Sequence, residues 1–257
     1  MINLIYRGDA AAVNLQLLRK FAPTAMACIF LVLSQTTSSA RKRPPAGSRV
    51  AIVVDERLSA LRTTPDFYGK LSRRVSRGGL VAIRGEKRNR DGVVFYRVNL
   101  TSRTSGWIQR DAVVSPSRPG DDARLLRLIK GSEDFDRIAR ARIFLDNFSL
   151  SEFRAEVLMI YAQAAEDASS HLSRDASRRL DEKEMNAGGA PLFSYFLNFN
   201  ELDRYNRQGV TFVFNAREKR FHYDGEGWQE IVHRYPRSSQ AVEARKCLEA
   251  RSALIAR

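Results

Sequence analysis

Arginine and aromatic residues gather between positions 68 and 107 in a combination that suits ligand binding. A guanidinium group can hydrogen-bond a carboxylate through two parallel N–H groups, and aromatic faces beside guanidinium groups suit sugars and carboxylate-bearing peptides. The candidate ligand-binding residues are Tyr68, Arg73, Arg74, Arg77, Tyr96 and Trp107. For Tyr96 and Trp107 the alternative is packing in a core or at its rim, because large aromatic rings bury much apolar surface.

Residues that commonly carry catalysis show no catalytic spacing. His222 and His233 are eleven positions apart, without a His-Glu-x-x-His pattern. The pair Asp121-Asp122 suits a helix start better than acid–base chemistry. The Gly-Gly pairs lack the Lys-Ser/Thr that follows in a phosphate-binding loop. We therefore expect a protein that is not an enzyme, with no metal site and no cofactor.

The chain has two cysteines, Cys28 and Cys247, which excludes a four-cysteine zinc site and a scaffold of several disulfides. Cys247 lies in an alanine-rich helical pattern, where a small buried side chain is the simplest interpretation. A catalytic thiol would need an activating neighbour, and the sequence around Cys247 offers none.

Net positive charge is confined to one part of the 257-residue chain. The whole sequence has 43 Lys and Arg against 29 Asp and Glu, a formal charge of +14. Residues 41–120 hold 18 basic and 6 acidic residues, whereas residues 121–257 hold 22 of each. Such asymmetry indicates an anionic partner for the basic part, and a solvated basic surface that only aids solubility is the alternative.

The first forty residues have the pattern of a secretory signal. Arg19-Lys20 precedes an apolar stretch over 21–34, and small residues end at Ala40, where we expect cleavage. The stretch is shorter than the roughly 20 residues that span a bilayer, although an uncleaved anchor and a buried helix are alternatives. A basic, proline-containing linker over 41–47 follows. We expect an exported protein of the periplasm or cell envelope that contacts the membrane only if the signal stays uncleaved.

Residues 48–115 predict a small β-barrel. Short apolar, β-branched and aromatic runs recur with turn residues between them, which is typical of small all-β folds. These runs cover 50–54, 80–83, 93–98, 106–108 and 112–114. The stretch 87–92 contains Asn, Asp and Gly and predicts an exposed hairpin loop.

The same region resembles the bacterial SH3-like domain in the order and spacing of its motifs. The matching stretches are Ser59–Pro65 for the first turn, Leu71 and Val75 leading to Gly78, Phe95–Val98 for the middle strand and Gly106–Ile108 for the last. The match departs at Ser59, where an apolar residue is usual, and at Thr64, where glycine is usual. The resemblance implies a non-catalytic module that binds a cell-wall polymer, such as peptidoglycan, or a peptide.

Residues 121–257 predict a helical domain. Acidic residues at 121–122 suit the start of a first helix, and apolar spacing predicts a second over about 133–148. Ser149 with Glu152 fits a capping box for a third helix that ends near Ala168. A polar helix over 172–185, a break at 186–191, a short helical segment over 193–205 and a hairpin of 210–214 with 220–223 follow.

The C-terminal stretch resembles the tetratricopeptide-type helical hairpins of envelope proteins. Tyr235-Pro236-Arg-Ser238 stands between two helical patterns, and residues 144–151 align with 231–238 at an offset of 87. That offset is no multiple of the 34-residue tetratricopeptide period. We therefore predict two degenerate hairpins separated by an insertion around 171–227. The alternative is that Pro236 and Ser238 merely end one helix and cap the next.

These observations predict an α+β multidomain protein, with a barrel over 48–115 and a tetratricopeptide-like domain over 121–257. We expect the basic barrel to bind an anionic cell-wall polymer or peptide, and the helical half to dock a protein partner. One alternative is a structural or assembly scaffold whose barrel packs only on its own helices. Nucleic-acid binding is a third possibility on charge alone, and export argues against it.

Overall fold

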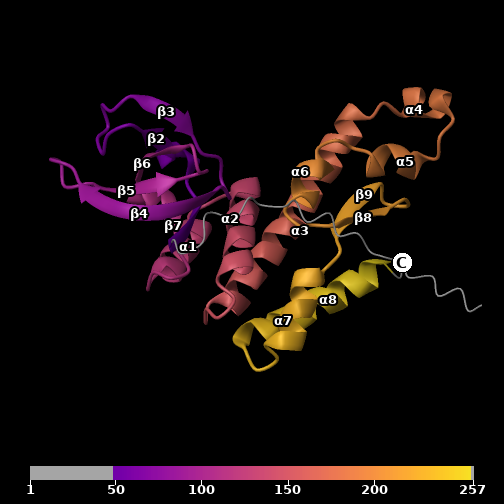
Figure 1. Ribbon diagram of the computed structural model, residues 1–257. Coiled ribbons are helices and arrows are strands. Elements are labelled where there is room, and N and C mark those ends of the chain that lie inside the picture. The colour runs from indigo at the N-terminus through magenta and orange to yellow at the C-terminus, as the bar shows by residue number, and fades with distance from the viewer. Residues whose placement is uncertain (1–48, 256–257) are drawn as a thin grey trace, which may run out of the picture. The chain divides into compact units, whose positions relative to one another are not determined.

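Seven short strands form one antiparallel sheet in the first part of the molecule (Figure 1). The computed structural model describes residues 49–255, so the expected signal (1–40) and linker (41–47) lie outside the described residues. The strands are β1 (Arg49–Val53), β2 (Ala60–Arg62), β3 (Leu71–Arg74), β4 (Leu80–Arg88), β5 (Val94–Asn99), β6 (Ser105–Gln109) and β7 (Val113–Val114). Short 3-10 turns, Glu56–Leu58 and Arg110–Ala112, connect them at two places.

The sheet stays open, whereas the sequence predicts a closed barrel. Its strand order is β3-β2-β6-β5-β4-β1-β7, and within the described residues no pairing joins β3 to β7. The edge at β7 is not free to close, because Ile52, Val54 and Val114 bury their side chains in the core of the helices. The inner face of the sheet has its own apolar cluster, in which Leu61, Tyr96 and Ile108 take part.

Eight helices and a two-stranded hairpin are described in residues 121–255. The helices are α1 (Asp121–Lys130), α2 (Asp134–Asn147), α3 (Arg154–Arg179), α4 (Glu182–Gly188), α5 (Leu192–Leu197), α6 (Leu202–Asn206), α7 (Glu226–Arg234) and α8 (Ser239–Ile255). The hairpin is β8 (Phe212–Asn215) with β9 (Arg220–Tyr223), close to the predicted stretches. In this described part of the chain, no helix has the length and apolar character needed to cross a membrane.

Helix α3 corrects two details of the sequence prediction. It runs for 26 residues without the predicted interruption near Ala168. Its N-cap is Phe153, with no side-chain capping bond, and the predicted capping box of Ser149 and Glu152 does not form. Ser151 instead donates its hydroxyl to Asp122 at the start of α1, at 2.8 Å.

The length of α3 has a physical cause in the hairpin that packs along it. The backbone N–H of Phe221 donates to the Ser173 hydroxyl at 2.8 Å, and that of Tyr223 donates to a Glu166 carboxylate oxygen at 3.2 Å. Glu166 and Ser173 are two helical turns apart and share one face. The uninterrupted helix therefore satisfies β9 N–H groups that the two-stranded ladder leaves unpaired.

Two antiparallel helix pairs, α2 with α3 and α7 with α8, are tied together by Arg154. The Arg154 guanidinium is buried and donates to the Leu145 carbonyl at 2.7 Å and to the Tyr235 hydroxyl at 3.2 Å. It also lies 3.7 Å from a carboxylate oxygen of Glu230. Both predicted inter-helix turns, near 148 and near 235, thus meet at one side chain.

The sheet is joined to the helices by a buried guanidinium on α2. Arg140 is 5% exposed; its Nε donates to the Val54 carbonyl at 3.1 Å and its Nη1 to the Ser132 hydroxyl at 2.6 Å. The same Nη1 lies 3.4 Å from Asp136, whose carboxylate also accepts from Arg77 at 2.8 Å. One arginine from each part therefore shares a single carboxylate.

Charge at this junction also sets the protonation of Asp136. Burial alone would raise the pKa of Asp136, but the hydrogen bond and charge of Arg77 and the charge of Arg140 hold it below its ordinary value of 3.8. A depressed carboxylate pKa stabilises the fold at pH values above that ordinary value. This contribution is lost as the pH falls through the lower pKa of the folded state.

The segment from Ser115 to Gly120 has the sequence Ser-Pro-Ser-Arg-Pro-Gly, which is typical of a linker, but it is packed at its start. Ser115 is buried, donates its N–H to Asp121 at 2.8 Å and donates its hydroxyl to the Val50 carbonyl at 2.7 Å. Arg118 donates to the Tyr96 hydroxyl at 3.0 Å. These bonds fix the chain where it leaves the sheet and enters α1.

Replacing Arg140 with Met should destabilise the whole described fold. The apolar stem is kept, but the Val54 carbonyl and the Ser132 hydroxyl lose a charged donor, which should cost about 3 kcal/mol of unfolding free energy. Denaturant unfolding followed by circular dichroism measures this loss. Arg73→Met is the control, because Arg73 is exposed on β3 and should change stability by less than about 0.5 kcal/mol. Equal stability of the two variants would contradict this role of Arg140.

Candidate functional site

A groove of about 620 Å³ lies between the β2–β3 loop and the β4–β5 hairpin. We call it the basic groove, because its lining includes three cationic side chains and one carboxylate. Its lining residues are Thr64, Pro65, Asp66, Tyr68, Gly69, Lys87, Arg88, Asn89 and Arg90. The predicted hairpin loop at 87–92 therefore forms one wall.

The β2–β3 loop is shaped by one aromatic contact and one close approach. Phe67 is 40% exposed, and its ring packs edge-to-face on buried Phe95 with centroids 5.4 Å apart. At Gly69 a Cβ atom would collide with the Thr64 hydroxyl and lie 3.1 Å from the Thr64 carbonyl oxygen, so a larger residue would require Thr64 to move. The Gly69 carbonyl also accepts from Arg62 at 2.7 Å.

This loop geometry presents Tyr68 to solvent. Next to Phe67, which contacts Phe95, Tyr68 is 95% exposed, and its backbone N–H donates to Asp66 at 2.8 Å. Monomeric proteins do expose single aromatic rings, but this one lines a groove beside three cations. The combination resembles a stacking platform flanked by anion-binding groups.

The cations of the opposite wall are largely uncompensated. Arg88 donates to the Gly92 carbonyl at 2.6 Å, which orients its guanidinium without neutralising it. Lys87 and Arg90 are exposed, and their side chains make no ion pair or hydrogen bond within residues 49–255. The groove can therefore attract an anion without first breaking an internal salt bridge.

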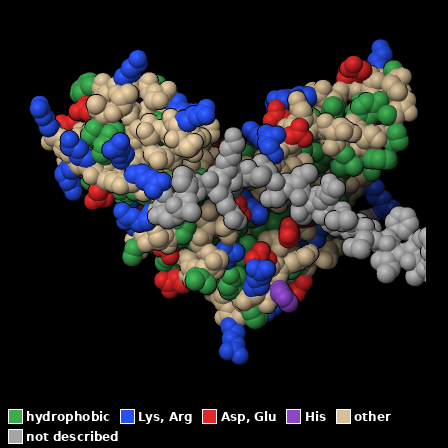
Figure 2. Space-filling view, in the orientation of Figure 1, with side chains coloured by type: hydrophobic (Ala, Val, Ile, Leu, Met, Phe, Trp, Pro, Cys, Tyr) green, Lys and Arg blue, Asp and Glu red, His purple; other side chains and the backbone are tan. Residues whose placement is uncertain are grey.

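The wider sheet surface carries the same sign of charge. Residues 49–115 contain 14 Lys and Arg and six Asp and Glu. Figure 2 shows Lys and Arg side chains spread over the part of the surface that the sheet forms, with fewer acidic side chains among them. Interactions of such exposed charges extend about 8 Å at physiological salt.

Three of the six candidate ligand-binding residues lie on exposed parts of the sheet. Tyr68 lines the basic groove, whereas Arg73 and Arg74 lie on the edge strand β3. Arg74 is the last residue of β3 and donates to the Arg57 carbonyl at 3.5 Å, whereas Tyr68 lies in the loop before β3 begins. The structure thus brings Tyr68 to the groove without Arg73 or Arg74 among its lining residues.

The other three candidates are engaged inside the protein to different degrees. The Arg77 side chain is only 15% exposed and is paired with Asp136. Tyr96 is buried in the sheet core and accepts a hydrogen bond from Arg118, so packing is its role here. Trp107 is half-buried on β6, between Arg62 on β2 and Arg97 on β5.

The sequence predicts the loop over 87–92 as an exposed hairpin, but its cations are not among the six candidate ligand-binding residues. The signal was present as Lys87, Arg88 and Arg90 clustered around a turn. The sequence alone did not reveal that the β2–β3 loop lies opposite that turn. The pairing of β2 with β6, which is remote in sequence, creates this juxtaposition.

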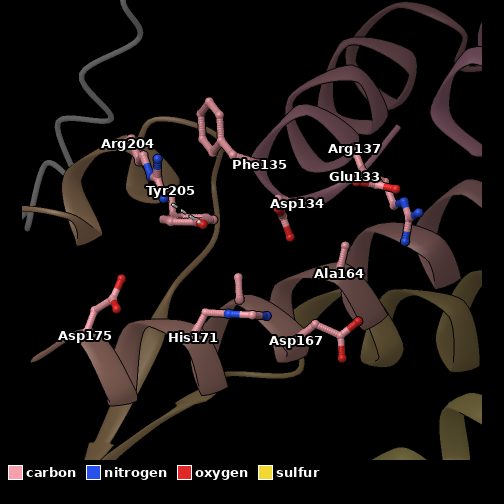
Figure 3. A pocket seen from close by; sticks show the side chains of 11 residues that line it. Glu133, Asp134, Phe135, Arg137, Ala164, Asp167, His171, Asp175, Arg204 and Tyr205 are labelled. Atoms are coloured by element: carbon pink, nitrogen blue, oxygen red, sulfur yellow. Dashed lines mark hydrogen bonds between the residues drawn. The ribbon is translucent and has the colours of Figure 1, made fainter. Parts of the chain in front are cut away.

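A second cavity, of about 410 Å³, lies in the helical half, where Figure 3 shows its lining side chains. Arg204 and Tyr205 of α6 form one wall, and the Arg204 guanidinium lies 4.9 Å from the Tyr205 ring centroid. Asp167 and His171 of α3 lie opposite, and Asp134 of α2 projects between them (Figure 3). The mixed charges leave no single ligand class favoured at this cavity.

Among the described residues no group of three or more His, Cys, Asp or Glu side chains could hold a metal ion. Comparisons of the chain with protein-family models, with curated proteins and with solved structures found no match.

Two neighbouring substitutions in the groove loop should have different effects on stability. Phe67→Ala removes the ring that packs on Phe95 and should lower the unfolding free energy by about 1–2 kcal/mol. Tyr68→Ala removes an exposed ring and should change it by less than about 0.5 kcal/mol. Chemical denaturation of both variants measures the difference. A Tyr68→Ala variant as unstable as Phe67→Ala would mean that Tyr68 serves packing instead of binding.

Proposed function

We propose that this protein is an exported, non-enzymatic protein of the bacterial cell envelope, whose basic groove binds an anionic cell-wall polymer or peptide. The observation that carries the proposal is an almost fully exposed Tyr68 facing solvent in a groove with Lys87 and Arg90, neither of which has a partner in the described structure. A polymer that bears carboxylates or phosphates can neutralise these cations while an apolar part of it stacks on the ring.

We further propose that the sheet is an opened form of the bacterial SH3-like module. Three of the motifs that carry the resemblance fall on strands that are neighbours in the sheet. Ser59–Pro65 covers β2, Gly106–Ile108 lies within β6 and Phe95–Val98 lies within β5. The helical half would then be two degenerate tetratricopeptide-like hairpins, α2–α3 and α7–α8. Support comes from the ends of α2 and α7, near 148 and 235, which lie within the two stretches of this chain, 144–151 and 231–238, that align with each other.

The helical half would dock a protein partner. Phe193 and Leu197 lie four residues apart on α5, and each leaves about half of its side chain exposed. Val213, on the neighbouring strand β8, is also exposed. Exposed apolar side chains on one element favour a protein contact over a charged polymer.

Two alternatives make different demands on the same residues. A structural scaffold would use the sheet only to pack on α1 and α2, so the cations of the basic groove would be dispensable. A nucleic-acid-binding protein would use the same cations against phosphates, with a steep loss of affinity in salt. Measuring which anionic polymer binds, and at which residues, distinguishes these two alternatives from the proposed function.

Neutralising the groove should weaken binding to an anionic polymer about tenfold. The variant Lys87→Gln/Arg88→Gln/Arg90→Gln removes three charges, each worth about 0.5 kcal/mol at an exposed site. The purified protein is titrated against fluorescent poly-L-glutamate, against polyphosphate and against single-stranded DNA. A matched control, Lys183→Gln/Arg237→Gln/Lys246→Gln, removes three exposed charges from the helical half.

The control variant should bind like the unmodified protein, because its charges lie outside the groove. Equal weakening of both triple variants would show that only total charge matters and would contradict a site at the groove. Binding of DNA in strong preference to both other polymers would favour the nucleic-acid alternative. No binding to any polymer would favour the scaffold.

A further inference from the structure

Strand β3 forms the outer edge of the seven-stranded sheet, and none of its residues lines the basic groove (Figure 1). All residues of this strand, Leu71–Arg74, are exposed. Within residues 49–255 its single strand neighbour is β2, so the other side of β3 has no paired strand. An open edge of this kind presents backbone N–H and C=O groups to which a further strand can add.

The register of β3 on β2 fixes which of its backbone groups face outward. The N–H of Val75 donates to the Ser59 carbonyl at 3.2 Å, on the side of β2. Along an antiparallel strand, consecutive residues direct these groups to opposite sides, and Arg74 is the residue paired with Ala60. Arg74 therefore directs its N–H and C=O away from β2, where one residue of an added strand can exchange two hydrogen bonds with it.

The side chains at this edge form a cationic strip. Lys70, Arg73 and Arg74 are exposed, and in the described part of the chain none of them forms an ion pair. Arg73 and Arg74 are consecutive, so their side chains project from opposite faces of the sheet. Residues opposite each other on paired strands share a face. An added strand therefore meets both charges when it carries two consecutive acidic residues.

Charge also decides which strand can occupy this edge. A second copy of the chain that paired through β3 would place arginines beside arginines, and like charges on neighbouring strands are destabilising. The chain's own stretch Arg41-Lys42-Arg43 carries the same sign. A nucleic acid supplies the opposite charge but no strand that can exchange both backbone hydrogen bonds with Arg74. An acidic segment of another protein supplies both.

We propose that β3 is a docking edge, to which an extended segment of a partner protein with two consecutive acidic residues adds as a further strand. The backbone of the segment pairs with that of Arg74, and its two carboxylates lie beside the guanidinium groups of Arg73 and Arg74. This edge is separate from the basic groove, so the loss of this docking and the loss of polymer binding in the groove are separate results.

The first test compares the capped peptide Val-Thr-Glu-Glu-Thr-Val with the same peptide methylated on every backbone nitrogen. The two peptides carry equal charge, but only the first can donate backbone hydrogen bonds. In a proton–nitrogen NMR titration of the purified protein, the first peptide should shift the Arg74 backbone signal in a saturable way and slow hydrogen exchange of that N–H. It should bind about tenfold more tightly than the methylated peptide, because the methylated strand cannot donate to the Arg74 carbonyl and its methyl groups keep the backbones apart.

Charge reversal on the protein provides the second test. Arg73→Glu/Arg74→Glu should bind the acidic peptide about tenfold more weakly and should instead prefer the capped peptide Val-Thr-Lys-Lys-Thr-Val. Both positions are exposed, so circular dichroism should show an unchanged fold. The groove variant Lys87→Gln/Arg88→Gln/Arg90→Gln is the matched control and should bind the acidic peptide as the unmodified protein does.

The proposal is overturned by the absence of a saturable shift at Arg74, by equal affinity for the two acidic peptides, or by undiminished binding to Arg73→Glu/Arg74→Glu. Loss of peptide binding in the groove variant would place the peptide in the basic groove and would also contradict the proposal. Slowed exchange at Arg74 in the free protein that increases with protein concentration would assign the edge to a second copy of the chain instead.

Discussion

Arg140 places one positive charge where the sheet meets the helices. The arrangement of the sheet on the helices depends on the hydrogen bonds and the carboxylate that compensate this charge. A buried guanidinium is costly unless hydrogen bonds and a counter-charge compensate it. Here the Val54 carbonyl, the Ser132 hydroxyl and Asp136 do so, and they come from the end of β1 and from the region around α2. Moving the sheet relative to α2 would leave the charge buried without partners. The contact therefore specifies position as well as contributing stability.

The carboxylates nearest the junction are engaged by neighbouring arginines. Asp55 pairs with Arg57, Asp136 with Arg77, and Asp121 with Arg118 and Arg124. The sheet also exposes Glu86 and Asp91, but within residues 49–255 neither forms an ion pair with Lys87 or Arg90. The carboxylates that stabilise the junction thus lie apart from the cations of the basic groove.

Local pattern predicted much of the fold, but long-range contacts decided the rest. Turn residues and β-branched runs located β1, β4, β5, β6 and β7, and apolar spacing located α1, α2, α7 and α8. Strands β2 and β3 were missed because they are short and polar, and the open sheet could not be foreseen because Ile52 and Val54 bury against helices instead of closing a barrel. For the site, Tyr68 could be found from its type and neighbours, but the burial of Tyr96 and the pairing of Arg77 depend on Arg118 and Asp136, which are remote in sequence.

The central claim is that exposed cations of the sheet, rather than apolar packing, hold an anionic partner. Affinity for poly-L-glutamate measured between about 0.1 M and about 1 M salt tests it most directly, because the screening length falls over that range from about 10 Å to about 3 Å. The account predicts that affinity falls steeply with salt and that the groove triple variant depends on salt less than the unmodified protein. Binding that is insensitive to salt, or an equally steep dependence in both proteins, would contradict it.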